Sequence, residues 1–246
     1  MLEAVTFDWW FTITNMPVPA KDFASRAKKF RLGGMSEVLK DSGLEVPEER
    51  LSEAYEMLSK DLEDAWARKL DISGEEQIAL FLRHAGVRET DDNGLIERLG
   101  VPFRNAVLDC PPSLNPGVAE CIAALKKDGC KIGIISNTGR TWGRALIELQ
   151  NLYGIRDYFD VLSFSDEIGV RKPHPAIFMK TLRELGLPAK SVLHIGDNVV
   201  DDVSGAKAVG MRAVWYNTGT WPDASTDEAD AEIHHFSELP AIVRRL

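Results

Sequence analysis

The residues of this sequence that could do chemistry follow short apolar runs, and the first of them is Asp8. It comes directly after the run Ala4–Phe7, which is rich in β-forming residues and is predicted to be a buried parallel strand. Open parallel sheets bind their ligands at the carboxyl ends of their strands. Asp8 is therefore a candidate nucleophile or metal ligand, and the alternative is a residue that caps the first loop.

Two further segments could bind an anion. The apolar run 131–135 ends in Ser136, Asn137 and Thr138. Their hydroxyl and amide groups suit a phosphate or carboxylate pocket, although the same residue types are common in turns and helix caps. Lys172 stands just before two prolines, which favour an extended backbone. This segment predicts a fixed cation, and the alternative is a solvated lysine beside a turn.

A pair of carboxylates follows a later apolar run. The run ends in Gly196-Asp197, and Asp202 stands five residues further on, at the start of a predicted small-residue helix. Carboxylates this close repel each other unless a cation lies between them. Mg²⁺ usually binds through one or two carboxylates together with water and phosphate oxygens. The pair therefore predicts a magnesium site, which is compatible with helix capping by Asp201 or Asp202.

These four segments together resemble the four sequence motifs of the haloacid dehalogenase (HAD) superfamily. The resemblance rests on order and spacing, and the residues that carry it are Asp8 with Thr12, Ser136, Lys172, and Gly196-Asp197 with Asp202. It covers most of residues 1–15 and 109–246. It implies an α/β, Rossmann-like core with a parallel sheet over these residues, and a four-helix, C1-type cap domain inserted over residues 16–108.

The inserted segment has the pattern expected of such a cap. After Pro17, β-branched runs stop and helical periodicity takes over, as at Leu51 and Leu62. Breaks that divide the segment into about four helices lie near residues 43–47, 71–74 and 86–92. A cap closes over an active site and excludes water from it. We expect this one to move on hinges near residues 14–18 and 108–112.

The remainder of the chain alternates between strands and helices, which predicts a parallel sheet. Strands are expected over residues 131–136, 160–164, 191–195 and 212–216. Helices are expected near residues 116–128, 141–153, 174–186 and 202–209. A polar loop over residues 217–230 precedes a last short strand and helix.

The resemblance also implies roles for residues around the reacting phosphoryl group. Asp8 attacks phosphorus and becomes an aspartyl phosphate, which water then hydrolyses. Ser136, Asn137 and Lys172 bind the phosphoryl group, and Trp10 contacts the substrate. Phosphoryl transfer leaves protein groups little to do beyond positioning and charge neutralisation, and this arrangement supplies both.

The cofactor implied by the resemblance is Mg²⁺. Its ligands would be Asp8, Asp197 and the backbone carbonyl of Trp10. Asp202 would hold a metal-bound water or the motif lysine, and Thr12 would orient Asp8.

One position departs from the pattern of phosphatases in the superfamily. They have an Asp two residues after the nucleophile, which protonates the leaving alcohol and later activates water, whereas this chain has Trp10 there and Phe11 in place of the usual Gly. Indole cannot exchange a proton near neutral pH. General acid–base catalysis typically contributes about 10²–10⁴-fold, so we expect weak hydrolysis of alkyl phosphates.

Trp10 leaves other functions open. An aromatic residue at this position is similar to the Tyr of 2-haloacid dehalogenases, which attack carbon without a metal but lack the acidic pair formed here by Asp197 and Asp202. A phosphonatase would need a cap lysine, for which the candidates are Lys21, Lys28, Lys29 and Lys40. A weakly active, ligand-binding protein is the remaining alternative. The acidic pair favours a Mg²⁺-dependent phosphatase.

Composition narrows the possible partners. The chain has 246 residues and a formal net charge of −9, with a sequence pI of about 5.1. An acidic chain without a long basic run is a poor candidate for nucleic-acid binding. No apolar run is long enough to cross a membrane, and the absence of a charged leader and the three cysteines without metal-like spacing fit a cytoplasmic protein. We expect a small phosphorylated substrate and a monomer or homodimer.

Basic residues near the predicted cap form a local exception. They are Lys21, Arg26, Lys28, Lys29 and Arg31. Because they fall around a helix rather than on one face, a solvated helix surface is the favoured interpretation. Arg140, just after the second motif, could reach a substrate anion.

Overall fold

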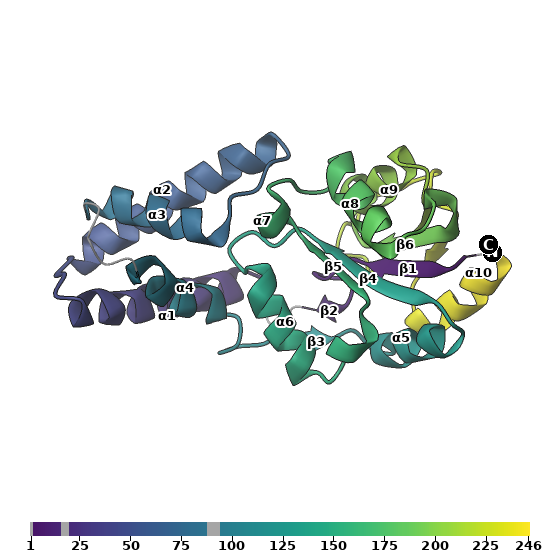
Figure 1. Ribbon diagram of the computed structural model, residues 1–246, viewed down its shortest axis with the longest axis horizontal. Coiled ribbons are helices and arrows are strands. Elements are labelled where there is room, and N and C mark those ends of the chain that lie inside the picture. The colour runs from purple at the N-terminus through teal and green to yellow at the C-terminus, as the bar shows by residue number, and fades with distance from the viewer. Residues whose placement is uncertain (1, 16–19, 88–93) are drawn as a thin grey trace.

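The computed structural model describes residues 2–15, 20–87 and 94–246, and its centre is a six-stranded parallel sheet (Figure 1). In spatial order the strands are β5 (Val161–Phe164), β4 (Lys131–Ser136), β1 (Ala4–Phe7), β6 (Val192–Gly196), β7 (Arg212–Tyr216) and β8 (Ala231–Ile233). Every residue of β1 and β6 is buried. Such near-continuous apolar strands are typical of parallel sheets covered on both faces.

Helices cover the two faces of this sheet. Val5 and Phe7 point into one apolar cluster, which is completed by α5 (Val118–Lys127), α6 (Gly143–Leu152) and α10 (Leu239–Arg245). Ala4 points into the opposite cluster with α8 (Pro175–Leu185) and α9 (Gly205–Ala208). In Figure 1, α8 and α9 lie above the sheet and α5 and α6 below it. This alternation follows from the two-residue period of a strand.

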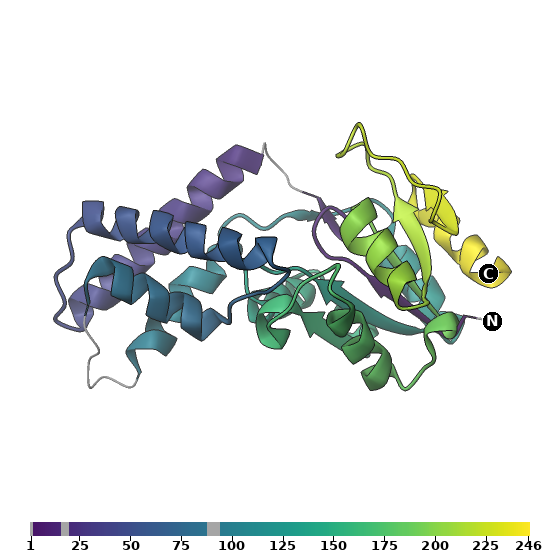
Figure 2. The same ribbon diagram turned by 90° about the horizontal axis from the view of Figure 1, so that it is seen from above.

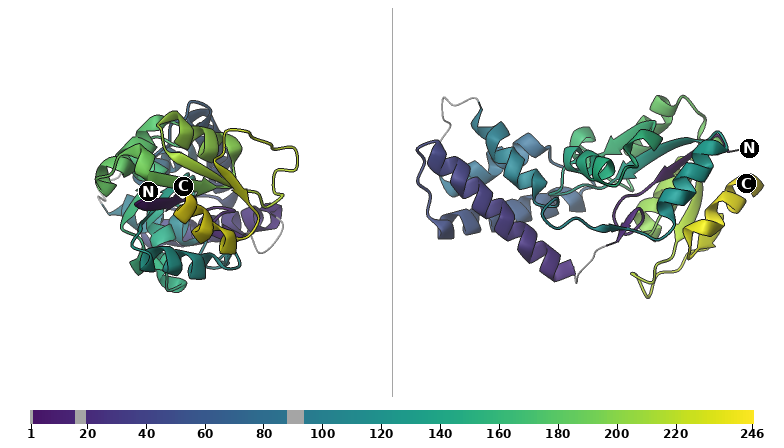
Figure 3. Two further views of the ribbon diagram at one scale, coloured as in Figure 1. Left: turned by 90° about the vertical axis from the view of Figure 1, so that its right-hand side faces the viewer. Right: turned by 90° about the horizontal axis from the view of Figure 1, so that it is seen from below.

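Four further helices lie beyond one end of the sheet rather than within its layers (Figures 1 and 2). They are α1 (Ala20–Asp41), α2 (Glu48–Ala67), α3 (Gly74–Ala85) and α4 (Leu95–Asn105). They share an apolar cluster that includes Met35, Leu58 and Phe81, all fully buried. The core contributes one side chain to this cluster, Trp142, which packs so closely that a Cβ on Gly74 would lie 2.4 Å from its ring. Figure 3 shows the bundle at the opposite end of the molecule from α10.

Short elements complete the chain. The strands β2 (Thr14–Asn15) and β3 (Ser113–Leu114) pair antiparallel where the chain passes between the sheet and the bundle. The remaining turns of helix are η1 (Arg156–Tyr158), α7 (Ser165–Ile168), η2 (Ala189–Ser191), η3 (Val199–Ser204) and η4 (Phe236–Glu238). Within the described residues, no helix is long and apolar enough to span a membrane.

The structure confirms the α/β fold class and, to within one residue at each end, the four strands predicted after residue 110. The helix predicted near 202–209 is wrong in its start and type. It begins at Val199 as the π-helical segment η3 and becomes α-helical only at Gly205. Two predictions lie partly outside the described residues, namely the hinge near 14–18 and the helix break near 86–92.

Candidate active site

The predicted site residues converge at the carboxyl ends of β4, β1 and β6. The chain runs outward from β1 to β4 and β5 on one side and to β6, β7 and β8 on the other, so the strand order reverses at β1. Asp8 follows β1, Ser136 ends β4 and Asp197 follows Gly196 at the end of β6. Such a reversal opens the crevice in which α/β sheets bind ligands.

The loop after β1 turns sharply at Phe11. Its φ of 59° is uncommon for a residue with a bulky side chain. Asn115 Nδ2 holds the turn by donating to the carbonyls of Phe11 (3.2 Å) and Thr12 (2.7 Å). Trp9 points into the core and is fully buried, whereas Trp10 is half-buried and borders a cavity.

Lys172 lies between two buried carboxylates. Its ammonium group donates to Asp8 Oδ1 and to Asp202 Oδ1, both at 2.6 Å, and its side chain is only 2% exposed. Asn137 fixes the backbone of Lys172, because its Oδ1 accepts from the Lys172 amide (2.8 Å) and its Nδ2 donates to the Lys172 carbonyl (3.2 Å). The fixed cation predicted at this position is therefore present.

Asp202 is held by three donors. In addition to Lys172, His194 Nε2 lies 3.0 Å from Asp202 Oδ1, and the backbone N–H of Asn198 donates to Asp202 Oδ2 at 3.0 Å. A Cβ at residue 196 would lie 2.0 Å from the Asp202 carboxyl carbon, so the glycine is required by this close approach. Neither of the two aspartates considered for capping caps the following turn. Asn198 does so, accepting from the amides of Val200 and Asp201.

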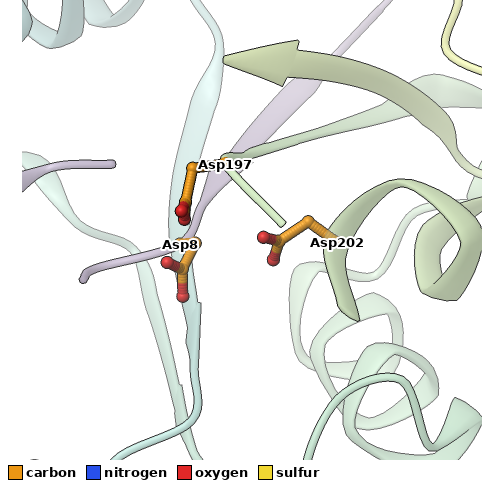
Figure 4. A group of neighbouring side chains, drawn as sticks. All are labelled: Asp8, Asp197 and Asp202. Atoms are coloured by element: carbon orange, nitrogen blue, oxygen red, sulfur yellow. The ribbon is translucent and has the colours of Figure 1, made fainter. Parts of the chain in front are cut away.

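Asp197 also accepts hydrogen bonds on both oxygens. Trp221 Nε1 donates to Oδ2 at 2.7 Å, Thr12 Oγ1 donates to Oδ1 at 3.3 Å, and Trp215 Nε1 donates to the backbone carbonyl at 2.9 Å. Thr12 therefore contacts Asp197, not Asp8 as the resemblance implied. The side chains of Asp8, Asp197 and Asp202 lie close together, as Figure 4 shows.

The pKa values of the three carboxyl groups are shifted in different directions. Burial, together with Asp202 and Asp197, raises the pKa of Asp8 well above its usual range against the opposing effect of Lys172. Burial and Asp202 raise the pKa of Asp197 to about 6. Burial would raise the pKa of Asp202 as well, but Lys172 and His194 outweigh it and hold that pKa below its usual range. Burial lowers the pKa of His194, against the opposing effect of its hydrogen bond to Asp202.

The donor set fits a hard divalent cation. Oxygen atoms of Asp8, Asp197 and Asp202 lie within 4.8 Å of one another. Three carboxylates and one ammonium leave an excess of negative charge in a buried place, which a divalent cation would offset. Asp202 has three hydrogen-bond partners, two of them on Oδ1. Among the described residues, Asp197 accepts one hydrogen bond on each carboxylate oxygen and Asp8 accepts one in all, so Asp8 and Asp197 have more lone pairs left for a cation.

Ser136 is suited to an anion. Its Oγ is fully buried and has no hydrogen-bond partner among the described residues. A buried hydroxyl without a partner is costly unless a ligand supplies one. Asn137, predicted to bind substrate, fixes Lys172 with its amide group and bonds Asp201 (3.2 Å), and it also lines the cavity beside the cluster.

A cavity of about 450 Å³ lies between the bundle and the sheet, next to this cluster. Its walls come from the loop after β1, from α1 and α2, from the loop after β4 and from the segment before Lys172. The residues that line it are Trp10, Phe11, Phe23, Ala24, Ala27, Arg31, Tyr55, Trp66, Asn137, Thr138, Gly139, Arg140, Thr141 and Arg171.

The prediction that the basic residues of α1 form a solvated helix surface is wrong for Arg31, which is buried. It is 4% exposed and donates from Nε to the Phe103 carbonyl (2.9 Å) and from Nη1 to the Tyr55 hydroxyl (3.2 Å). Helical periodicity could not reveal this, because the burial comes from contacts with α2, α4 and the loop after β4. Arg26 and Lys29 are exposed, as expected.

Two residues at the site, Trp221 and Arg171, were not predicted from the sequence. Trp221 stood in a segment interpreted only as a polar loop, and an isolated Trp among turn residues was the available signal. Arg171 directly precedes Lys172, and only the lysine was predicted to have a role. His194, within β6, bonds Asp202, and Thr6 Oγ1 lies 2.9 Å from its Nδ1.

Sequence comparisons find similar proteins that are named phosphatases. The glyceraldehyde 3-phosphate phosphatase of Pyrococcus furiosus is 33% identical over 53% of this chain and 53% of its own. The enzyme of the same name from Methanopyrus kandleri is 28% identical over 100% of this chain and 99% of its own. The first curated relatives are thus matched over about half of their length, and the Methanopyrus protein over nearly all of it.

Structural and family comparisons agree on the fold. A 2-haloacid dehalogenase from Pseudomonas syringae pv. Tomato superposes with a TM-score of 0.68 and 25% identity, covering 100% of this chain and 99% of its own. Residues 3–210 match the profile of haloacid dehalogenase-like hydrolases. That range includes Asp8, Lys172 and Asp202, and with it the chain belongs to the haloacid dehalogenase-like hydrolase family.

Proposed function

We propose that this chain is a Mg²⁺-dependent phosphatase that acts on a small phosphorylated molecule through an aspartyl phosphate on Asp8. The observation that carries the proposal is the buried cluster in which Lys172 bonds both Asp8 and Asp202 beside the carboxylate of Asp197. The phosphatase names of the similar proteins support the reaction class.

Each residue of the cluster has a part in this reaction. Lys172 engages Asp8 Oδ1, and no described residue donates to Oδ2, so one carboxylate oxygen remains for attack on phosphorus. The bond from Asp8 to phosphorus forms as the ester bond breaks, and water then releases phosphate and restores Asp8. Ser136 and Lys172 bind the phosphoryl oxygens, and Asp202 with His194 positions Lys172.

Mg²⁺ would be held by Asp8 and Asp197, with the Trp10 carbonyl as the third protein ligand that the family resemblance suggests. When bound, it would neutralise charge on the phosphoryl oxygens and on the carboxylates around them. Trp221 and Thr12 fix the orientation of Asp197 by hydrogen bonds to its two oxygens.

We expect chelation to abolish hydrolysis of p-nitrophenyl phosphate and added Mg²⁺ to restore it. Without the cation, ionised carboxylates would repel a phosphate dianion. Asp197→Asn removes one charge, and we expect it to raise the Mg²⁺ concentration for half-maximal rate at least about tenfold. Undiminished activity in chelator would contradict the proposal. If 2-haloacids were then turned over, the chemistry would be the carbon-centred reaction of dehalogenases.

We further expect rates to depend steeply on the leaving group, because Trp10 cannot protonate it. Aryl and acyl phosphates release stable anions, so the missing acid should lower their hydrolysis rates little. Alkyl phosphates should react at least about 10²-fold more slowly. Trp10→Asp should flatten this dependence. Trp10→Phe keeps an aromatic side chain against the core and should leave the dependence steep. Equal kcat/KM for aryl and alkyl esters at saturating Mg²⁺ would point to another acid.

The four helices are proposed to serve as a cap domain over residues 16–108 that selects the substrate. They have an apolar cluster of their own and supply one wall of the cavity. They also contact the core through the α2–α3 loop, where the Asp71 amide donates to the Gly169 carbonyl (3.0 Å) and the Arg171 amide to the Lys69 carbonyl (3.1 Å). Opening of the cap would have to break these bonds beside Lys172.

A further inference from the structure

The cavity of about 450 Å³ adjoins the catalytic cluster at Asn137. This residue lines the cavity and is bonded to the backbone of Lys172. A phosphate ester whose phosphoryl group lies against Ser136 and Lys172 would therefore extend its leaving group into the cavity. The residues that line the cavity then indicate which kind of leaving group it would bind.

The charge on these walls has one sign. Three arginines line the cavity, Arg31, Arg140 and Arg171, and no Asp or Glu is among its lining residues. The hydrogen bonds of Arg31 go to protein acceptors, including the Arg140 carbonyl (3.3 Å), so it contributes charge and holds the loop after β4. The guanidinium groups of Arg140 and Arg171 each have a buried donor without a hydrogen-bond acceptor among the described residues.

Arg140 has a buried donor without an acceptor. Its guanidinium carbon lies 5.8 Å from the Tyr55 ring and 5.5 Å from the Trp66 ring. Its Nε is buried and has no hydrogen-bond partner in the described part of the chain, nor does any described carboxylate lie within 4 Å of the group. Aromatic rings stabilise a cation but do not neutralise it.

Arg171 is in a similar position on the same indole. Its guanidinium carbon lies 4.6 Å from the Trp66 ring, and its Nη1 is buried without a hydrogen bond. The nearest carboxylate, Asp71, is 3.7 Å away and already accepts from Trp66 Nε1 and the Ile72 amide, each at 3.0 Å, and from Ser165. Two guanidinium groups thus flank one indole with unused donors.

We propose that Arg140 and Arg171 form a second anion-binding subsite, so that the preferred substrate is a phosphate monoester whose leaving group carries a further carboxylate or phosphate. Buried donors without acceptors are costly, and an anion would supply acceptors for Arg140 Nε and Arg171 Nη1 through charge-assisted hydrogen bonds. The planar guanidinium suits both carboxylate and phosphate. The proposal rests on the phosphatase function, since it takes the cavity to hold the leaving group.

Matched esters test the subsite. One pair is 4-carboxyphenyl phosphate with 4-carbamoylphenyl phosphate, and the other is 1,4-phenylene bisphosphate with phenyl phosphate. We expect kcat/KM of the parent protein to favour the charged member of at least one pair by about tenfold or more, and Arg140→Gln or Arg171→Gln to reduce that preference about 10–100-fold. The pair that shows the preference distinguishes a carboxylate from a phosphate.

Arg183→Gln is the matched control. Arg183 is exposed on α8 and outside the cavity, so the preference should not change. Because each variant is measured on both members of a pair, differences in leaving-group stability cancel. A parent protein without preference in either pair would overturn the subsite, as would a preference retained in both the Arg140 and the Arg171 variants.

Binding separates the subsite from the phosphatase function. Calorimetric titration of the same esters into the Asp8→Asn protein with Mg²⁺ should show the same preference in Kd, and Arg140→Gln in that background should remove it. If the parent protein hydrolysed no ester, the proposed function would fail, and these titrations would still decide whether the arginines bind the second anion.

Discussion

Replacing Asp8 by Asn should lower kcat for p-nitrophenyl phosphate by more than about 10³-fold, because an amide oxygen is a poor nucleophile at phosphorus. The variant should remain folded. Its amide oxygen can still accept from Lys172, which retains Asp202 as a partner at 2.6 Å. Steady-state rates, with mass spectrometry to exclude deamidation, measure the effect. Residual turnover above a few per cent of the parent rate would assign the attack to another residue.

The same substitution should not destabilise the protein and should stabilise it near pH 8 in chelator. Burial and the neighbouring carboxylates raise the pKa of Asp8 in the folded state. A carboxyl with a raised pKa costs stability as the pH rises through that pKa, and Asn removes this cost. Urea unfolding at about pH 5 and pH 8 checks the sign. Asp157→Asn, at an exposed aspartate of η1, is the matched control and should change neither rate nor stability.

Replacing Lys172 by Met should reduce both activity and stability. It removes the ammonium group that bonds Asp8 and Asp202 and leaves two buried carboxylates without it. Loss of one partner of a buried ion pair costs about 3–5 kcal/mol, and the phosphoryl group would lose its cation as well. We expect that loss in the free energy of unfolding and a fall in kcat of more than about 10²-fold.

The stability deficit of Lys172→Met should depend on pH. In the parent protein Lys172 holds the pKa of Asp202 below its usual range, a contribution that is present above the ordinary carboxyl pKa of about 4 and is lost as pH falls through the folded-state value. In the variant Lys172 no longer opposes the effect of burial, which raises the pKa of Asp8 and Asp202. These carboxyls then become protonated in the variant as the pH falls from 8 toward 5, so the deficit should be largest near pH 8 and shrink toward pH 5.

Two variants control this result. Lys180→Met removes a partly exposed surface lysine that pairs with Glu184 at 2.7 Å, and it should cost less than about 1 kcal/mol at either pH. Adding Asp202→Asn to Lys172→Met removes one of the stranded charges and should recover part of the lost stability. A deficit that is equal at both pH values, and is not recovered in the double variant, would show that Lys172 acts mainly through packing.

Much of the core could be predicted from the sequence because its signals are local. Continuous apolar runs such as Val192–Gly196 can be buried only as interior strands, and the polar residues at their ends mark the sheet edge where ligands bind. Asp8, Ser136 and Asp197 were found in this way, and Lys172 from the two prolines after it. The structure brings all four to one edge of the sheet or the loop beside it.

The helix after β6 was predicted less well for a physical reason. Small residues after Asp202 indicate a helix, but its start is set by Asn198, whose side chain caps the turn, and by the contact of the Asp202 carboxyl with Gly196. Both contacts act at the first turn of η3, and neither follows from periodicity.

By itself the sequence determined the class of chemistry, because the types and order of Asp8, Lys172 and Asp202 are properties of the chain. Only the tertiary structure decided the partners of these groups. Lys172 reaches Asp8 from 164 positions away, and Thr12 bonds Asp197 rather than Asp8. Likewise, Arg31 is buried because α1 packs against α4 and α2 and because the loop after β4 contacts it. Long-range contacts depend on how elements pack, and local composition carries no record of that packing.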